Sequence, residues 1–373
     1  MTVDARITAF SFRRQRLDGS ATTALEAVAS VVGVYGTNPS GPLSIHVRAP
    51  TVPRDDVIAL DTDRIAVRMR AMRTSGFIVP RATAALVHAS TDVPIERFGW
   101  LMRGLRLDER SFSRVRNEIV AATATPRTAQ ELRAAVDLEE RETGPLLSLL
   151  GLHGDIVSVG TGSLTSNSSR YQARAAWLAG DEEPPDPDPN EARAWLAGEY
   201  LRAFGPARVA DFAWWSGLTG TLAAAAIGVH DTVDVGDGLL LLARETDAFE
   251  ATEPLAGVVT LLPKWDAWTM GYPLDGRSRF LDRAVHDRVF DGDGNGLGMV
   301  LVDGRAAGAW LHRAAGTAMA VDLDLFDRAG AKLTATLEDA FANVAGFLGY
   351  RRATMRAVDT VVPNRRRIRR PLD

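Results

Sequence analysis

Alternating carboxylate and amide oxygens begin at Asp291 and give the sequence its most suggestive ligand pattern. Asp291, Asp293 and Asn295 occupy every second position with glycines between them, as in the first half of an EF-hand calcium loop. The twelfth position of such a loop needs a bidentate glutamate, but Val302 occupies it here. The flanking residues have strand patterns, so we expect a polar hairpin turn and no metal site.

Other residues that could act as nucleophiles or metal ligands are dispersed along the chain. The sequence has no cysteine, so disulfides, thiol nucleophiles and cysteine-bound zinc are excluded. It also lacks the phosphate-binding loop, HExxH, GxSxG and dinucleotide-binding signatures. The histidines are scattered singly, and a lone histidine is more often a core or surface residue than a ligand; they are His46, His88, His153, His230, His286 and His312. We expect no metal and no nucleotide cofactor.

Two helices and a tight connection are predicted by the segment 191–222. Its first part has apolar residues at helical spacing up to Phe204. Gly205 can adopt the left-handed conformation that closes a helix, and Pro206 suits the first turn of the next one. The sequence therefore predicts that two helices meet at Gly205 and Pro206.

A third helix and a strand should follow this pair. The second helix, 209–215, ends at a Ser-Gly break, and the next helix can begin near Thr219 and serve as the reader of a nucleic acid. The apolar run 238–244 has the pattern of a strand. Three helices and a hairpin form a winged helix, although periodicity alone fits an ordinary helical hairpin inside an enzyme equally well.

Three stretches of this chain resemble one bacterial family: YLRAFGPARVADFAWWSGL at 200–218, LLPKWDAWTMGY at 261–272 and VLVDGRAAGAW at 300–310. They are similar to the winged-helix DNA-binding proteins that include the AlkZ/YcaQ-type DNA glycosylases, which unhook alkylated and cross-linked bases. The resemblance extends over most of the chain. It implies an α+β fold of tandem winged-helix modules with a small C-terminal β-barrel-like domain, forming a C-shaped channel for duplex DNA.

The resemblance also implies a site in the segment VVGVYGTNP at 31–39. The family places two glutamines there, whose amides hold the water that attacks the sugar carbon. Tyr35 and Thr37 occupy those positions here, and their hydroxyls can bind a water but present no amide carbonyl. Alkylated purines already carry a cationic leaving group, so positioning supplies much of the catalysis. Tyr35 and Thr37 are thus the candidate catalytic residues of a variant motif.

The first module is predicted at 1–104, with a helix at 21–32, a strand at 43–48, a helix at 65–72 and a strand at 76–80. His46 and Arg48 would lie on the 43–48 strand and contact the lesion or a phosphate of the DNA.

The second module is predicted at 105–180. Helices at 111–124 and 127–137 are separated by Pro126, with Thr128 and Glu131 at capping-box spacing, and a third helix covers 146–152. The segment 156–171 has the pattern of a hairpin with a flexible tip. The resemblance implies a hairpin that probes a groove, so Leu164 is a candidate minor-groove wedge.

The remaining boundaries follow from composition. The acidic, proline-rich segment 181–190 is predicted to be a linker, and the third winged helix covers 191–255. The C-terminal domain, 256–362, should contain strands at 258–262, 299–302 and 322–326 and a helix at 337–348. A basic tail, 363–373, completes the chain.

Charge is distributed unevenly. The net charge is −4, but residues 1–180 sum to +4, residues 181–362 to −12 and residues 363–373 to +4. Phosphate contacts should therefore come from the first two modules and from the tail arginines Arg365, Arg366, Arg367, Arg369 and Arg370. The 41 arginines against two lysines also fit a compositional bias of the gene.

We find no membrane segment or signal peptide, and expect a cytoplasmic protein.

Three functions remain open from the sequence. The protein could be a base-excision enzyme for alkylated or cross-linked DNA, a DNA-binding lesion sensor or regulator without chemistry, or an interaction module that has lost DNA binding. The aromatic residues offer no separate argument, because in small modules they usually fill cores; those in question are Tyr171, Trp214, Trp215, Trp265 and Trp268.

Overall fold

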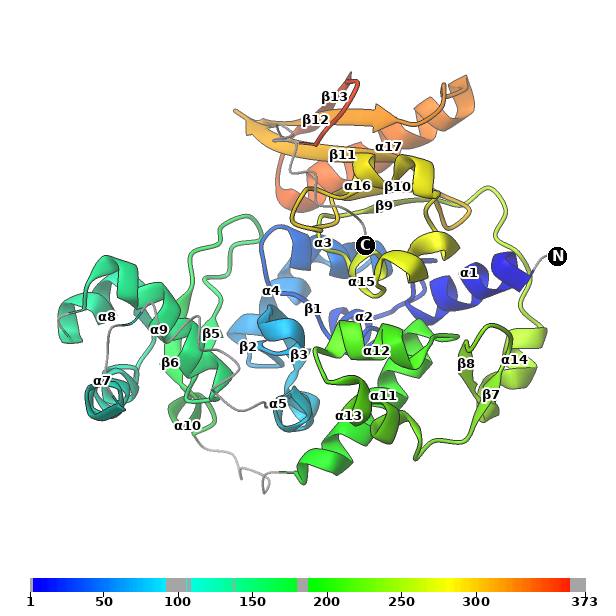
Figure 1. The fold of residues 1–373 in the computed structure, drawn as a ribbon. Coiled ribbons are helices and arrows are strands. Elements are labelled where there is room, and N and C mark those ends of the chain that lie inside the picture. The colour runs from blue at the N-terminus through cyan, green and yellow to red at the C-terminus, as the bar shows by residue number, and fades with distance from the viewer. Residues whose placement is uncertain (1–2, 92–104, 106–108, 137, 180–186, 363–373) are drawn as a thin grey trace.

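The computed structural model describes residues 3–91, 105, 109–136, 138–179 and 187–362. The fold is α+β, as predicted, with the C-terminal sheet at one end of the molecule and helices α11, α12 and α13 at the other (Figure 1). No helix in the described part of the chain is long and apolar enough to cross a membrane. The tail arginines at 365–370 and the linker residues 181–186 lie outside the described residues.

One order of elements is repeated in the described part of the chain: a helix, a strand, two helices and two strands. It occurs twice in full and a third time without its first strand. After α1 (Val3–Arg14), the first set comprises α2 (Ala24–Ala29), β1 (Val34–Tyr35), α3 (Ser40–Arg48), α4 (Arg54–Thr62), β2 (Ala66–Arg70) and β3 (Gly76–Pro80), and α5 (Ala84–Thr91) follows it. The second comprises α7 (Glu109–Ala122), β4 (Arg127–Thr128), α8 (Ala129–Val136), α9 (Glu140–Leu152), β5 (Ile156–Val159) and β6 (Arg170–Ala173), with α10 (Arg174–Trp177) after it.

The third set has a single bridging residue in place of its first strand. It comprises α11 (Pro189–Phe204), α12 (Val209–Ser216), α13 (Gly220–Ile227), β7 (Thr232–Asp234) and β8 (Leu240–Leu242), followed by α14 (Thr246–Glu250). Ala207 pairs with Leu240 where the first strand would lie. Pro189 and Asn190, which were expected in the linker, form the start of α11.

Local signals explain several of these elements. Thr219 caps α13 by accepting a hydrogen bond from the Leu222 amide, so the predicted third helix is confirmed. Thr128 and Glu131 exchange the hydrogen bonds of a capping box, as predicted, at the start of α8. The hairpin expected at 156–171 is present as β5 and β6.

The first two sets share one sheet but differ in their cores. Their six strands follow the order β1-β3-β2-β5-β6-β4, and the two sets are joined where Arg68 pairs with Ser158. The second set has a separate hydrophobic core around Ile119, Leu132 and Leu150. The first set, the third set and the C-terminal part share one large core, to which the second set adds Val157, Leu164 and Trp177. The second set is therefore the more independent body.

The C-terminal part is an open sheet and not a barrel. It contains β9 (Val259–Leu262), β10 (Gly298–Val302), β11 (Arg305–Ala315), β12 (Ala318–Leu325) and β13 (Arg352–Ala357), with helices α15 (Ala267–Met270), α16 (His286–Val289) and α17 (Ala331–Leu348). The strand order is β13-β12-β11-β10-β9, so β9 and β13 form opposite edges. The prediction of a barrel-like domain was wrong on this point. The predicted strands and the predicted helix at 337–348 are present.

Three local predictions were wrong. Residues 43–48 belong to helix α3, because side chains all round this segment are buried and its alternation does not mark a solvent face. Residues 66–70 form strand β2 and not a helix, because they pair with β3 along their whole length. Gly205 is extended, with φ −67° and ψ 160°, because the chain must continue to the pairing of Ala207 with Leu240. Pro206 therefore does not lie in the first turn of the next helix, which begins at Val209.

The acidic segment at Asp291 forms the polar turn that the sequence predicts. The Asp291 carboxylate accepts hydrogen bonds from the backbone amides of Asp293 and Asn295 and from the Asn295 side chain. No group of three or more potential metal ligands occurs among the residues that the structure describes.

Candidate functional site

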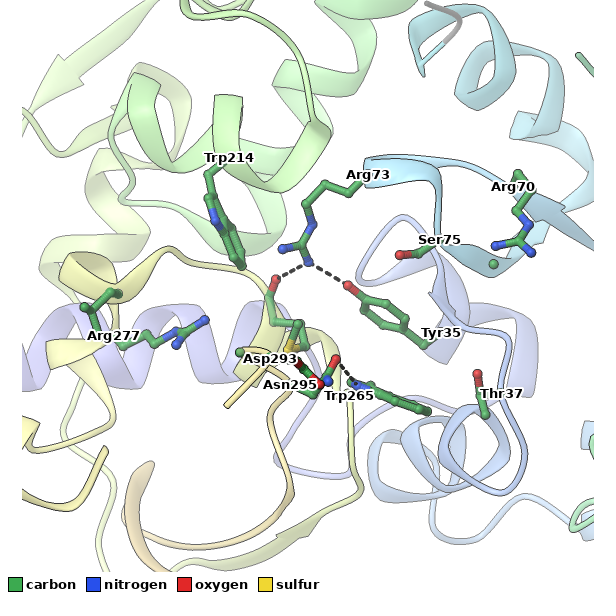
Figure 2. A pocket seen from close by; sticks show the side chains of 14 residues that line it. Tyr35, Thr37, Arg70, Arg73, Ser75, Trp214, Trp265, Arg277, Asp293 and Asn295 are labelled. Atoms are coloured by element: carbon green, nitrogen blue, oxygen red, sulfur yellow. Dashed lines mark hydrogen bonds between the residues drawn. The ribbon is translucent and has the colours of Figure 1, made fainter. Parts of the chain in front are cut away.

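A pocket of about 660 Å³ lies where the first set, the third set and the C-terminal part meet. Strand β1 supplies Tyr35, the segment after it supplies Thr37, and the turn η1 (Met72–Thr74) supplies Arg73 (Figure 2). Trp214 comes from α12 and Arg277 from η5 (Leu274–Arg279). The rest of the wall consists of Arg70, Ser75, Gly76, Trp265, Met270, Leu274, Asp293, Gly294 and Asn295.

Tyr35 is held in a fixed position at the wall of the pocket. Its ring packs against Phe77 with 4.5 Å between ring centroids, and the residue is 8% exposed. The phenolic oxygen accepts a hydrogen bond from the Arg73 guanidinium over 2.7 Å. Burial raises the pKa of Tyr35, and the nearby Arg73 offsets part of this rise. The phenol is therefore neutral at pH 7 and keeps its own O–H for donation.

Arg73 has an unusual backbone conformation. Arg73 and Thr74 have φ values of 51° and 60°, a region that non-glycine residues rarely adopt. The turn between β2 and β3 holds them there, and the Arg73 guanidinium lies 3.9 Å from the centroid of the Trp214 ring. Its Nε is buried and has no hydrogen-bond partner in the part of the chain that the structure describes. Strain of this kind is found most often at functional sites.

Thr37 lies between two adjoining pockets. Its side chain is partly exposed, and its hydroxyl makes no hydrogen bond to the part of the chain that the structure describes. A second pocket, of about 360 Å³, shares Thr37, Arg70 and Gly76 with the first and extends between β2 and the β5–β6 hairpin. The Thr37 hydroxyl is thus available to a ligand or a water in either pocket.

Three arginines make the main pocket strongly basic. None of Arg70, Arg73 and Arg277 forms an ion pair with a carboxylate among the described residues. Burial, and secondarily the charge of Arg73, lower the pKa of Arg277 to about 10, so Arg277 stays cationic at pH 7. The Asp293 carboxylate lies on the wall but pairs with none of them in the described structure.

Trp265 is held in place by a hydrogen bond of its own side chain and by the contacts of its neighbour Asp266. Its indole N–H donates to the Asn295 side chain over 3.0 Å, and its backbone has a φ of 61°. The next residue, Asp266, is fully buried and accepts two hydrogen bonds from Arg48, at 2.8 and 3.0 Å. The Ser44 hydroxyl also donates to Asp266 over 2.6 Å. Helix α3 therefore positions the Trp265 segment.

This arrangement corrects the roles expected for Arg48 and His46. Arg48 is 0% exposed and is used in the ion pair with Asp266, so it cannot reach a phosphate. His46 stacks on Phe347 with 4.1 Å between centroids and contacts Asn343 at 3.2 Å, so it faces α17 and not the pocket. The prediction was wrong because it placed these two residues on a strand. In helix α3 their side chains point inward.

Leu164 is not an exposed wedge. It is 4% exposed and packs near Pro42 and Ile58 of the first set. Asn38 fixes the same loop by donating to the carbonyls of Ser163 and Ser166, both over 2.7 Å. Asn167 adds a reciprocal pair of hydrogen bonds to the Asn38 backbone. The tip of the β5–β6 hairpin is therefore docked beside Thr37, where it was expected to project freely.

The aromatic residues divide into two groups. Trp215 and Trp268 are buried, as predicted, but Trp214 and Trp265 line the pocket and Tyr171 lines its neighbour. Sequence reasoning also missed Arg70, Arg73 and Arg277. The adjacent pair Trp214 and Trp215 carried a signal, because neighbours on a helix point about 100° apart and only one can face the core.

The expected reader helix is poorly equipped for base contacts. Helix α13 has the sequence GTLAAAAI and carries Thr221 as its single polar side chain. The strongest base contacts in a groove are made by arginine, lysine, asparagine and glutamine side chains, and α13 has none of these. The basic pocket is therefore the stronger candidate site.

Comparisons with known proteins agree with this architecture. The family model described as DNA glycosylase AlkZ-like matches residues 28–347. The structure is similar to the Streptomyces sahachiroi DNA glycosylase AlkZ, with a TM-score of 0.76 and 22% sequence identity over 95% of this chain and 99% of that one. Among curated protein sequences, none matches this chain.

The family model, with a fold similar to AlkZ, defines a DNA glycosylase-like DNA-binding protein. The chain belongs to the AlkZ-like DNA glycosylase family, because the family model covers most of its length.

Proposed function

We propose that this protein binds duplex DNA that carries an alkylated or cross-linked base and holds the damaged nucleotide in the main pocket without hydrolysing it. One observation carries the proposal: the Tyr35 phenol is buried and hydrogen-bonded to Arg73 where the resemblance implies a water-holding amide. Tyr35 can donate to a water, but its oxygen already accepts a hydrogen bond from Arg73 and it presents no amide carbonyl to hold the water.

The charges around Tyr35 also favour binding over hydrolysis. Breaking a glycosidic bond places positive charge on the sugar, and catalysis requires groups that stabilise this charge. Arg70, Arg73 and Arg277 would instead oppose it, and the Asp293 carboxylate is solvent-exposed at the rim. The same three arginines suit the phosphates beside a bound nucleotide.

We propose further that the three repeated sets are winged helices arranged around the duplex. Their shared order of helix, strand, two helices and two strands supports this, with Ala207 replacing a strand in the third set. Arg70 and Arg73 belong to the first set, which the charge distribution favours for phosphate contacts. The arginines at 365–370 would add contacts from the tail.

A second candidate is a glycosylase with a variant site. It is favoured by the Thr37 hydroxyl, which faces the pocket region without a protein partner in the described structure. Thr37 and Tyr35 could together orient a water, and a cationic alkylpurine would leave with little acid catalysis.

A third candidate, an interaction module without DNA binding, is favoured by the net charge of −12 over residues 181–362.

Equilibrium binding separates the first two candidates from the third. Fluorescence anisotropy would compare a labelled duplex containing one N7-alkylguanine with the unmodified duplex at several salt concentrations. The proposal predicts binding that weakens steeply with salt and favours the damaged duplex. No binding to either duplex at low salt would refute the proposal and favour the interaction module.

A further inference from the structure

Arg73 and Arg277 place two guanidinium groups against the same aromatic side chain. Their central carbons lie 3.9 and 5.7 Å from the centroid of the Trp214 ring, and Figure 2 shows both side chains extending toward the middle of the pocket. The two residues are 204 positions apart in the sequence, so the tertiary fold brings them together. Arg73 lies directly on the Trp214 ring, whereas Arg277 lies closer to the Phe290 ring, 3.7 Å from its centroid, with Trp214 beyond it.

The hydrogen bonds of these guanidiniums go mainly to neutral groups. Arg73 donates to the Tyr35 hydroxyl and, at 3.5 Å, to the Met270 carbonyl, and its Nε has no partner among the described residues. Arg277 donates to the Tyr272 carbonyl and contacts a nitrogen of His286 at 2.9 Å. In the part of the chain that is described, neither arginine meets a carboxylate at ion-pair distance.

A buried arginine beside a second positive charge is unfavourable, and Arg277 is in this position, with Arg73 nearby and no carboxylate at ion-pair distance among the described residues. Arg277 is 6% exposed, and its lowered pKa records this cost. An anion between the two groups would remove the repulsion and complete their hydrogen bonding. A cationic group bound there would add to the repulsion.

We propose that Arg73 and Arg277 form a phosphate site and that the pocket takes a nucleotide with its phosphate there and its base toward Trp265. Asn295 and Asp293 lie on the Trp265 side and can accept hydrogen bonds from the amino groups of a base. The phosphate can come from the backbone of a damaged duplex or from a free nucleotide. The inference rests on the proposed function in placing a nucleotide in this pocket.

Isothermal titration calorimetry tests the phosphate site with four probes on the full chain. Deoxyadenosine 5′-monophosphate is the monoester, deoxyadenosine lacks the phosphate, thymidylyl-thymidine supplies a backbone diester, and inorganic phosphate supplies the anion alone. The monophosphate should bind at least about tenfold more tightly than the nucleoside, since each charged hydrogen bond contributes substantially. Inorganic phosphate should compete with it. If the diester binds as well as the monoester, the ligand is a backbone phosphate. If the diester binds more weakly, the ligand is a terminal phosphate.

Variants assign the effect to the two arginines. Arg73→Gln and Arg277→Gln should each weaken nucleotide binding about tenfold or more, while Arg73→Lys should retain part of it. Arg352→Gln, an exposed change on β13, is the matched control and should have no effect. If Arg277→Gln fails to fold, Arg73→Gln and its lysine counterpart suffice. Equal affinity for nucleotide and nucleoside, or unchanged binding in Arg73→Gln, would overturn the inference.

Duplex binding by the same samples separates the two proposals. Duplex binding without phosphate-dependent nucleotide binding would refute the phosphate site and leave the proposed function intact. Nucleotide binding without duplex binding would refute the proposed function and leave the phosphate site intact.

Discussion

The Arg73 guanidinium donates a hydrogen bond to the phenolic oxygen of Tyr35 over 2.7 Å and lies on the Trp214 ring. This contact ties the segment that carries Tyr35 and Thr37 to helix α12 of the third set. It also uses a lone pair of the Tyr35 oxygen that could otherwise accept a hydrogen bond from water. Arg73 therefore both adds positive charge to the pocket and, through its hydrogen bond to Tyr35, weakens the pocket as a hydrolytic site.

Installing amides should restore water-holding groups. The double variant Tyr35→Gln/Thr37→Gln replaces the two hydroxyls with the residues that the resemblance implies. We expect strand cleavage at an N7-alkylguanine after alkali treatment, with little or none in the wild type. Thr37→Gln alone should be inactive, because the Tyr35 phenol remains. If the double variant folds, binds the lesion and stays inactive, the missing amides are not what prevents hydrolysis.

Arg73 should contribute to duplex binding through phosphate. Arg73→Gln is expected to weaken duplex affinity about tenfold and to reduce the slope of log affinity against log salt by about one. Anisotropy titrations at four salt concentrations would measure both quantities. The exposed Arg352→Gln serves as control. An unchanged slope in Arg73→Gln would place the duplex elsewhere on the protein.

The Arg48–Asp266 ion pair should be important for stability. Asp266→Ala leaves Arg48 buried without its counterion, and we expect a loss of about 3 to 5 kcal/mol in the free energy of unfolding. Asp322→Ala removes partly exposed ion pairs with Arg313 and Arg356 and should cost about 1 kcal/mol or less. Urea denaturation followed by tryptophan fluorescence would compare the two. Equal losses would contradict the assignment of Arg48 to the core.

Asn38 should hold the β5–β6 loop in place. Asn38→Ala removes both side-chain hydrogen bonds to the carbonyls of Ser163 and Ser166, and we expect a loss of about 1 to 3 kcal/mol. Proteolysis within 160–169 should become faster. The exposed Thr165→Ala is the control, because its hydroxyl has one weak contact at 3.5 Å. Cleavage at the wild-type rate in Asn38→Ala would show that the loop is held by other contacts.

Acidification should destabilise the protein partly through His46. Burial lowers the pKa of His46 below its usual 6.5, so the folded state keeps this ring neutral where the unfolded state takes up a proton. The stability from this residue is present above pH 6.5 and is lost as the pH falls below it. His46→Gln should reduce the loss between pH 7 and pH 5 in urea denaturation, and the exposed His153→Gln should not. Parallel curves for the wild type and His46→Gln would contradict this.

Sequence reasoning succeeded where a local signal determined the structure. The caps at Thr128 and Thr219 act within one turn of helix, so their spacing was sufficient. It failed at 43–48 because burial on every side of α3 hides its periodicity. The resemblance led to Tyr35 and Thr37, and both line the pocket. Their chemical roles stay predictions.

The rest of the pocket could not be found from local patterns. Arg73, Trp214, Trp265 and Arg277 come from segments far apart in the chain, and no spacing relates them. Their grouping depends on how the first set, the third set and the C-terminal part pack around one shared core.

The most direct test uses an end-labelled duplex with one N7-alkylguanine, incubated with excess protein and an unmodified duplex beside it. The bound fraction is measured first, and the same sample is then treated with alkali to cleave any abasic site. The account predicts a bound and uncut damaged duplex. Strand cleavage that depends on both the lesion and the protein would contradict it and establish that the protein hydrolyses the glycosidic bond.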